Sequence, residues 1–189
     1  MLTNLFIRAG DPHVLVVGMT GVKLGERVAQ IGCAHGGRLA AIARKAGLSG
    51  TAVAFVPDNA SAARARKGAA SAGVLVEIQT APPTRVPADD GAFDLVVIDG
   101  TAGLLASMPA DDRAGAVLEA LRLLRPGGRV VVIGSAPRGG LAGLLRRAPA
   151  APPFDPEPDL RAGGFRSVRT LAARDGLTFV EGIKPRQGA

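Results

Sequence analysis

The feature that most constrains the fold is a series of short apolar runs, each followed by a stretch with helical character. An apolar run without polar alternation is typical of a strand that is covered on both faces. Strands of this kind, separated by helices, predict an α/β fold with a mostly parallel sheet. The expected strands are residues 26–31, 51–56, 74–78, 93–99 and 129–133.

The segments between these runs predict helices. A helix is expected after Gly37, with Leu39 and Ile42 on one face and Gly47 at its end. A second begins at Asp58 or Asn59 and runs to about residue 72. A third begins at residues 111–112 and ends at residues 126–128, which read Pro-Gly-Gly. A short lead-in helix is expected within residues 1–24, before the first strand.

Two further strands are expected at the end of the chain, over residues 165–171 and 178–183. They must be antiparallel to each other, because a parallel return needs a crossover of about a dozen residues. Residues 148–158 are rich in proline and predict a stiff loop. We interpret residues 1–189 as a single domain.

Composition limits the function more weakly. The formal net charge is +7, and most of the cations are arginine. A polyanionic partner such as nucleic acid is one interpretation, and a solvated basic surface is the other. We favour the solvated surface because no dense Lys/Arg run occurs. The chain has no Trp and no Tyr, so a site that stacks bases on several aromatic rings is not expected.

The cellular location is predicted from three features that the sequence does not show: paired cysteines, a signal peptide and a membrane-spanning run. Cys33 is the only cysteine, which excludes an intrachain disulfide and a cysteine metal cluster. The first residues do not form a clean signal peptide, and no apolar run is long enough to span a membrane. We therefore expect a cytoplasmic location.

The turn after the first strand, residues 32–37, consists mostly of small residues. Such a strand-turn-helix lets backbone N–H groups approach a ligand closely. The spacing Gly32, Ala34, Gly37 also matches a loose dinucleotide fingerprint, which alone is weak. The alternative is a tight turn that binds nothing.

Four segments of the chain are GERVAQIGCAHG (25–36), VPADDGAFDLVV (86–97), LRLLRPGGRVVV (121–132) and AGGFRSV (162–168). Together they resemble class I S-adenosylmethionine-dependent methyltransferases, in particular the small ubiquinone-biosynthesis-like (type 11) branch. The resemblance covers about residues 22–184. It implies a Rossmann-like, doubly wound sheet of seven strands in the order 3-2-1-4-5-7-6, closed by an antiparallel hairpin. It also implies S-adenosylmethionine as cofactor and a small-molecule substrate.

Departures from the family pattern concern the donor site. The resemblance implies carboxylates at the positions of Gln30 and Val56, and often a third near Pro82. A hydrogen bond to a charged group contributes about 1.5–3 kcal/mol. Binding of the methyl donor, S-adenosylmethionine, is therefore expected to be weak or lost. Changing Gln30 to Glu and Val56 to Asp is expected to restore it. Asp58 offers a substitute carboxylate, although a helix cap is the favoured interpretation.

The candidate catalytic residues are His35 and Asp99. Asp99 ends the fourth strand, at the edge where open α/β sheets bind ligands. A plain loop histidine and a turn-capping aspartate are the respective alternatives. No metal is predicted, because the fifth strand ends in Gly-Ser-Ala and His13 is distant in sequence. The candidate cofactor-binding residues are Gln30, Gly32, Ala34, Gly36, Asp58 and Asp99.

Two functions follow from these observations. The first is methyl transfer to a small molecule. The second is a non-catalytic relative that has lost the donor and serves as a binding or scaffold subunit, with a small molecule or a protein as partner. A nicotinamide-dependent oxidoreductase is weaker, because Val56 stands where its ribose-binding acid belongs.

Overall fold

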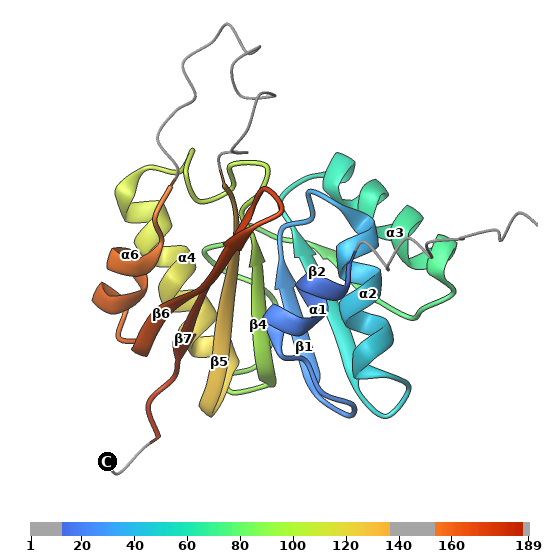
Figure 1. The fold of residues 1–189 in the computed structure, drawn as a ribbon, viewed down its shortest axis with the longest axis horizontal. Helices are drawn as coiled ribbons and strands as arrows, with labels where there is room; N and C mark the ends of the chain where they lie inside the picture. Colours follow the sequence, from blue (N-terminus) through green and yellow to red (C-terminus); the bar gives the residue numbers. More distant parts are fainter. Residues whose placement is uncertain (1–12, 137–153, 187–189) are drawn as a thin grey trace, which may run out of the picture.

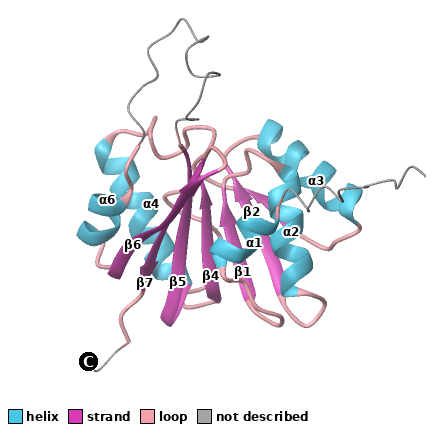
Figure 2. Ribbon diagram, viewed as in Figure 1, coloured by secondary structure: helices cyan, strands magenta, loops and turns pink. Residues whose placement is uncertain are grey.

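The computed structural model describes residues 13–136 and 154–186. Its strands form one seven-stranded sheet in the order β3-β2-β1-β4-β5-β7-β6, which confirms the expected order (Figures 1 and 2). β7 is antiparallel to β5 and β6, and the other neighbours are parallel. The strands are β1 (Arg27–Ile31), β2 (Thr51–Val56), β3 (Glu77–Thr80), β4 (Phe93–Asp99), β5 (Leu124–Ser135), β6 (Arg166–Arg174) and β7 (Leu177–Ile183).

Helices cover both faces of the sheet. α1, α2 and α3 pack on one face, and α4 and α6 pack on the other (Figure 2). Within the described residues, no helix is long and apolar enough to cross a membrane. The helices are α1 (Val14–Thr20), α2 (Gly36–Ala46), α3 (Asn59–Ala72), α4 (Ala110–Leu123) and α6 (Glu157–Ala162).

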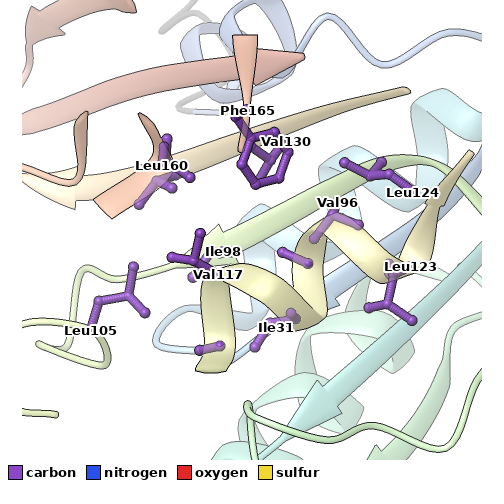
Figure 3. Packing of buried hydrophobic residues seen from close by; sticks show 14 of the residues in the cluster. Ile31, Val96, Ile98, Leu105, Val117, Leu123, Leu124, Val130, Leu160 and Phe165 are labelled. Carbon is purple, nitrogen blue, oxygen red and sulfur yellow. The ribbon is translucent and has the colours of Figure 1, made fainter. Parts of the chain in front are cut away.

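The core is divided by the sheet. On the α4 side, Ile31, Val96 and Ile98 are buried against Val117 and Leu123 (Figure 3). On the opposite side the neighbouring strand positions, including Val28 and Val97, pack on Val16 and Ile42. Successive residues of each central strand are therefore buried on opposite faces, which is why these strands are apolar without alternation.

Two predicted boundaries were wrong. β3 begins at Glu77 and not at residue 74, because the N–H of Val74 bonds back to the carbonyl of Ala69 and completes the end of α3. Residues 126–128 do not end α4. That helix ends at Leu123, and the Pro-Gly-Gly segment lies inside β5, where a register shift interrupts its pairing with β4.

The end of the chain was predicted more closely. The β6–β7 hairpin turns at Asp175 and Gly176, which both have positive φ, as a tight two-residue turn requires. Helix α6 was not expected. It includes residues 157–158 of the predicted proline-rich loop, because proline is tolerated in the first turn of a helix. Residues 148–153 of that loop lie outside the described residues.

Candidate functional site

The candidate site is the turn that joins β1 to α2, at the carboxyl edge of the sheet. Gly32 leaves the strand with a φ of 78°, a conformation that favours glycine, and its N–H donates to the carbonyl of Phe55 at 2.8 Å. α2 begins at Gly36. β4 ends beside this turn at Asp99.

Asp99 holds the turn in place. Its Oδ2 accepts from the N–H of Ala34 at 2.9 Å, and its Oδ1 accepts from the hydroxyl of Thr101 at 2.6 Å. Arg38 Nη1 lies 3.6 Å from Oδ1 and donates to the Thr101 hydroxyl at 2.7 Å. The structure therefore brings Asp99 next to the turn, as the sequence predicted. Both carboxylate oxygens are already used by groups of this chain.

The two donor-site positions that lack carboxylates are buried. Gln30 is 1% exposed, and its Nε2 donates to the carbonyl of Gly32 at 2.9 Å. Val56 is 0% exposed and packs with Leu39 and Ala65 between the sheet and the helices. Neither side chain points into solvent, so an introduced carboxylate would be buried at either position.

Asp58 acts as the cap of α3. Its Oδ1 accepts from the N–H of Ser61 at 2.7 Å. That backbone hydrogen bond lowers the pKa of the Asp58 carboxyl. The geometry is that of the helix cap that the sequence favoured, and the carboxylate keeps an exposed position two residues beyond β2.

The chain's own atoms occupy the space beside the glycines of the turn. A Cβ placed on Gly32 would stand 2.7 Å from Cδ2 of Leu104, in the loop after β4. A Cβ on Gly36 would stand 2.1 Å from the carbonyl oxygen of Arg64 and 3.0 Å from Cα of Gly68. Packing against the backbone of α3 therefore requires glycine at position 36, whereas the atom beside Gly32 is the end of a side chain that can rotate.

Cys33 is buried in the same region. The thiol side chain is 2% exposed, and the Nε of Arg64 donates to the Cys33 carbonyl at 2.9 Å. Burial, and then the negative charge of Asp99, raise the pKa of the Cys33 thiol to about 11. The thiol stays protonated at neutral pH and is a poor nucleophile.

The two histidines of the protein meet above this turn. The ring centroids of His13 and His35 lie 5.6 Å apart, although the sequence interpretation treated His13 as distant. The contact arises because the start of α1 lies over the start of α2, which no local pattern reveals. The described part of the chain contains no group of three or more His, Cys, Asp or Glu side chains that could hold a metal ion.

Three residues of the site were missed at the sequence level: Arg38, Arg64 and Leu104. Arg38 and Arg64 lie on helices where exposed cations are common, and Leu104 lies in an unpatterned loop. Only the folded chain shows that they contact the turn and Asp99. No sequence signal distinguishes them from surface or loop residues.

A cavity of about 320 Å³ opens further along the same edge, beyond β4 and β5. A second cavity, of about 440 Å³, lies between α1 and α2. Neither is lined by residues 32–37. The first is bordered by Thr101, Leu105, Val132, Ser135, Phe154 and Pro156, among others.

Residues 29–132, more than half of the chain, match the methyltransferase domain family, and the chain belongs to that family. Among curated proteins, none matches the sequence.

Solved structures share the fold at low sequence identity. A S-adenosylmethionine-dependent methyltransferase of Aquifex aeolicus is 19% identical over 90% of this chain and 88% of its own, with a TM-score of 0.69. The [4+2]-cyclase SpnF is 19% identical over 91% and 79%, with a TM-score of 0.64. A chain bound to the methyltransferase activator Trm112 in a Haloferax volcanii complex is 15% identical over 94% and 90%, also at 0.64.

Proposed function

We propose that this chain is a methyltransferase-fold protein that does not use S-adenosylmethionine and serves as a non-catalytic binding subunit. The observation that supports the proposal is the contact between Leu104 and Gly32: a Cβ on Gly32 would stand 2.7 Å from Cδ2 of Leu104, so this side chain lies against the glycine turn.

The charges around the turn support the same proposal. The donor carries a cationic amino group and ribose hydroxyls, which carboxylates bind well. Gln30 and Val56 offer none, and Asp99 is paired with Arg38. Within the described residues, the carboxylate nearest in sequence to the end of β2 is Asp58, which caps α3.

The cavity beyond β4 and β5 gives the subunit a surface to bind with. Its volume of about 320 Å³ suits a small molecule or one inserted side chain. The fold itself is compatible with several roles, since its relatives include a cyclase and a chain held in a complex with an activator protein. Small-molecule methyl transfer is the second candidate, favoured by family membership and by this cavity.

Titration calorimetry with S-adenosylmethionine tests the proposal. The unmodified protein is expected to give no binding heat at S-adenosylmethionine concentrations up to about 1 mM. Any binding would then be weaker than about 4 kcal/mol. Binding at low micromolar concentration contradicts the proposal and favours methyl transfer.

A second titration separates the blocked space from the missing charge. Leu104→Ala removes the side chain over Gly32, and Gln30→Glu adds the carboxylate that the family pattern implies. We expect weak binding only when both changes are combined. Both positions are buried, but Val56 packs among apolar side chains, whereas Gln30 is already a polar residue that hydrogen-bonds to the Gly32 carbonyl. Val56→Asp is therefore not a useful repair. Binding by Gln30→Glu alone would show that Leu104 is not an obstacle.

A further inference from the structure

Charge is segregated between the two helical layers. Helices α2 and α3 contain six cations and no acid within their bounds: Arg38, Arg44, Lys45, Arg64, Arg66 and Lys67. In residues 36–76 the single acidic residue is Asp58, the cap of α3. On the opposite face, α4 and α6 mix both signs, with Asp111, Asp112, Glu119, Glu157 and Asp159 beside Arg113, Arg122 and Arg161.

The cations of this layer are available to a partner. Arg44, Lys45, Arg66 and Lys67 are exposed. Arg64 is also exposed, but its guanidinium donates to the Cys33 carbonyl and to the Ser61 hydroxyl, so it is not counted with them. α2 and α3 lie side by side, with Arg44 Nη2 donating to the carbonyl of Ala72 across them at 3.2 Å (Figure 1). The cations on the other face and the C-terminal hairpin are often paired, as with Arg113–Asp159, Arg122–Glu119 and Arg169–Glu181.

We propose that the exposed face of α2 and α3, defined by Arg44, Lys45, Arg66 and Lys67 and called here the basic face, binds the phosphate backbone of a nucleic-acid duplex. The sequence pI is about 10.9, and α2 and α3 contribute six of the 23 Lys and Arg residues with no acid within their bounds. A local excess of cations along helices is the electrostatic pattern of such a surface. The basic face is independent of the donor site, so this inference does not rest on the proposed function.

The residue types select a duplex over a single strand. Binding of single strands commonly uses aromatic side chains on which bases stack. Within α2, β2 and α3 the only aromatic residue is Phe55, which is 1% exposed and faces the core. We therefore expect contacts from the basic face to be mainly with phosphates, which carry no sequence information.

Fluorescence anisotropy with a labelled DNA duplex of about 20 base pairs in about 50 mM NaCl tests the inference, with an RNA duplex and a single strand in parallel. The plot of log affinity against log salt is expected to have a slope of about −2 to −4. Arg66→Gln with Lys67→Gln is expected to weaken duplex binding about tenfold or more and to reduce that slope by about two.

The matched control is Arg85→Gln with Arg166→Gln, which removes the same charge from exposed sites outside α2 and α3. It is expected to keep nearly all of the affinity. Three results overturn the inference: no duplex binding by the unmodified protein, an equal loss in both double variants, or tighter binding of the single strand. Equal loss would show that net charge, and not the basic face, attracts the duplex.

Discussion

At the residue scale, two carboxylates that the sequence offers as ligand-binding groups accept hydrogen bonds from backbone N–H groups of the chain itself. Asp99 accepts from Ala34 and Thr101, and Asp58 accepts from Ser61. In each case the acceptor meets an N–H at a turn or helix start, where donors have no other partner. The cap at Asp58 and the turn contact of Asp99 with Thr101 were among the sequence interpretations, but the contact of Asp99 with Ala34 was not.

The role of Asp58 as a cap predicts a pH-dependent loss of stability. Its folded-state pKa is lowered, so its contribution is present above the ordinary carboxyl pKa and is lost as the pH falls through the lowered value. Asp58→Ala should therefore lower the free energy of unfolding at pH 7 and have little effect at about pH 2. Asp58→Asn should keep most of the stability at both pH values, since Asn also caps helices. Urea unfolding measures all three proteins, and an unchanged Asp58→Ala variant at pH 7 contradicts the capping role.

At the element scale, the close approach of α2 and α3 depends on two glycines. A Cβ on Gly36 would meet the carbonyl oxygen of Arg64 at 2.1 Å, and one on Gly68 would meet backbone atoms of Gly36 at 2.3 Å. These contacts are to backbone, which cannot rotate away as a side chain can. The glycine pair therefore fixes how far the start of α2 lies from α3.

Alanine substitutions test this packing. Gly36→Ala and Gly68→Ala should each lower the free energy of unfolding by about 1–3 kcal/mol, because one helix must shift. Gly18→Ala is the matched control, since no atom lies within 4 Å of its added Cβ inside helix α1. It should raise stability by about 0.5–1 kcal/mol. Chemical denaturation measures each variant, and a stabilising Gly68→Ala would show that the helices do not approach this closely.

At the scale of the whole molecule, Arg129 joins three parts of the chain. From β5, its Nη2 donates to the carbonyl of Gly21 at 2.6 Å and to Glu26 at 3.0 Å, and its Nε donates to Thr20. The carbonyls of Thr20 and Gly21 lie at the end of α1, and Glu26 precedes β1. One guanidinium thus holds the first helix against the middle of the sheet.

Removing this guanidinium should affect α1 most. Arg129→Met should lower the free energy of unfolding by about 2–4 kcal/mol, because Glu26 and two carbonyls lose their donor in a half-buried place. Arg169→Met is the control: the Arg169 side chain is 69% exposed, against 18% for Arg129, and its loss should cost less than about 1 kcal/mol. Hydrogen exchange should quicken in α1 only for Arg129→Met. Equal exchange in both variants contradicts the role of Arg129.

The sequence by itself determined that the chain forms buried parallel strands separated by helices and ends in an antiparallel hairpin. Apolar runs such as residues 93–99 predict buried parallel strands, and the short link at Asp175 and Gly176 allows only an antiparallel hairpin. These features are local, so they can be read without knowing what lies nearby. The single-domain interpretation of residues 1–189 stays a prediction.

Only the tertiary structure decided what surrounds the turn. The sequence shows that residues 32 and 36 are glycines but does not show which residues pack against them. Their neighbours, Leu104 and Gly68, are far away along the chain. The contact of His13 with His35 has the same cause. A glycine that admits a ligand and a glycine that admits another part of the chain have the same sequence pattern, and only contacts between distant segments distinguish them.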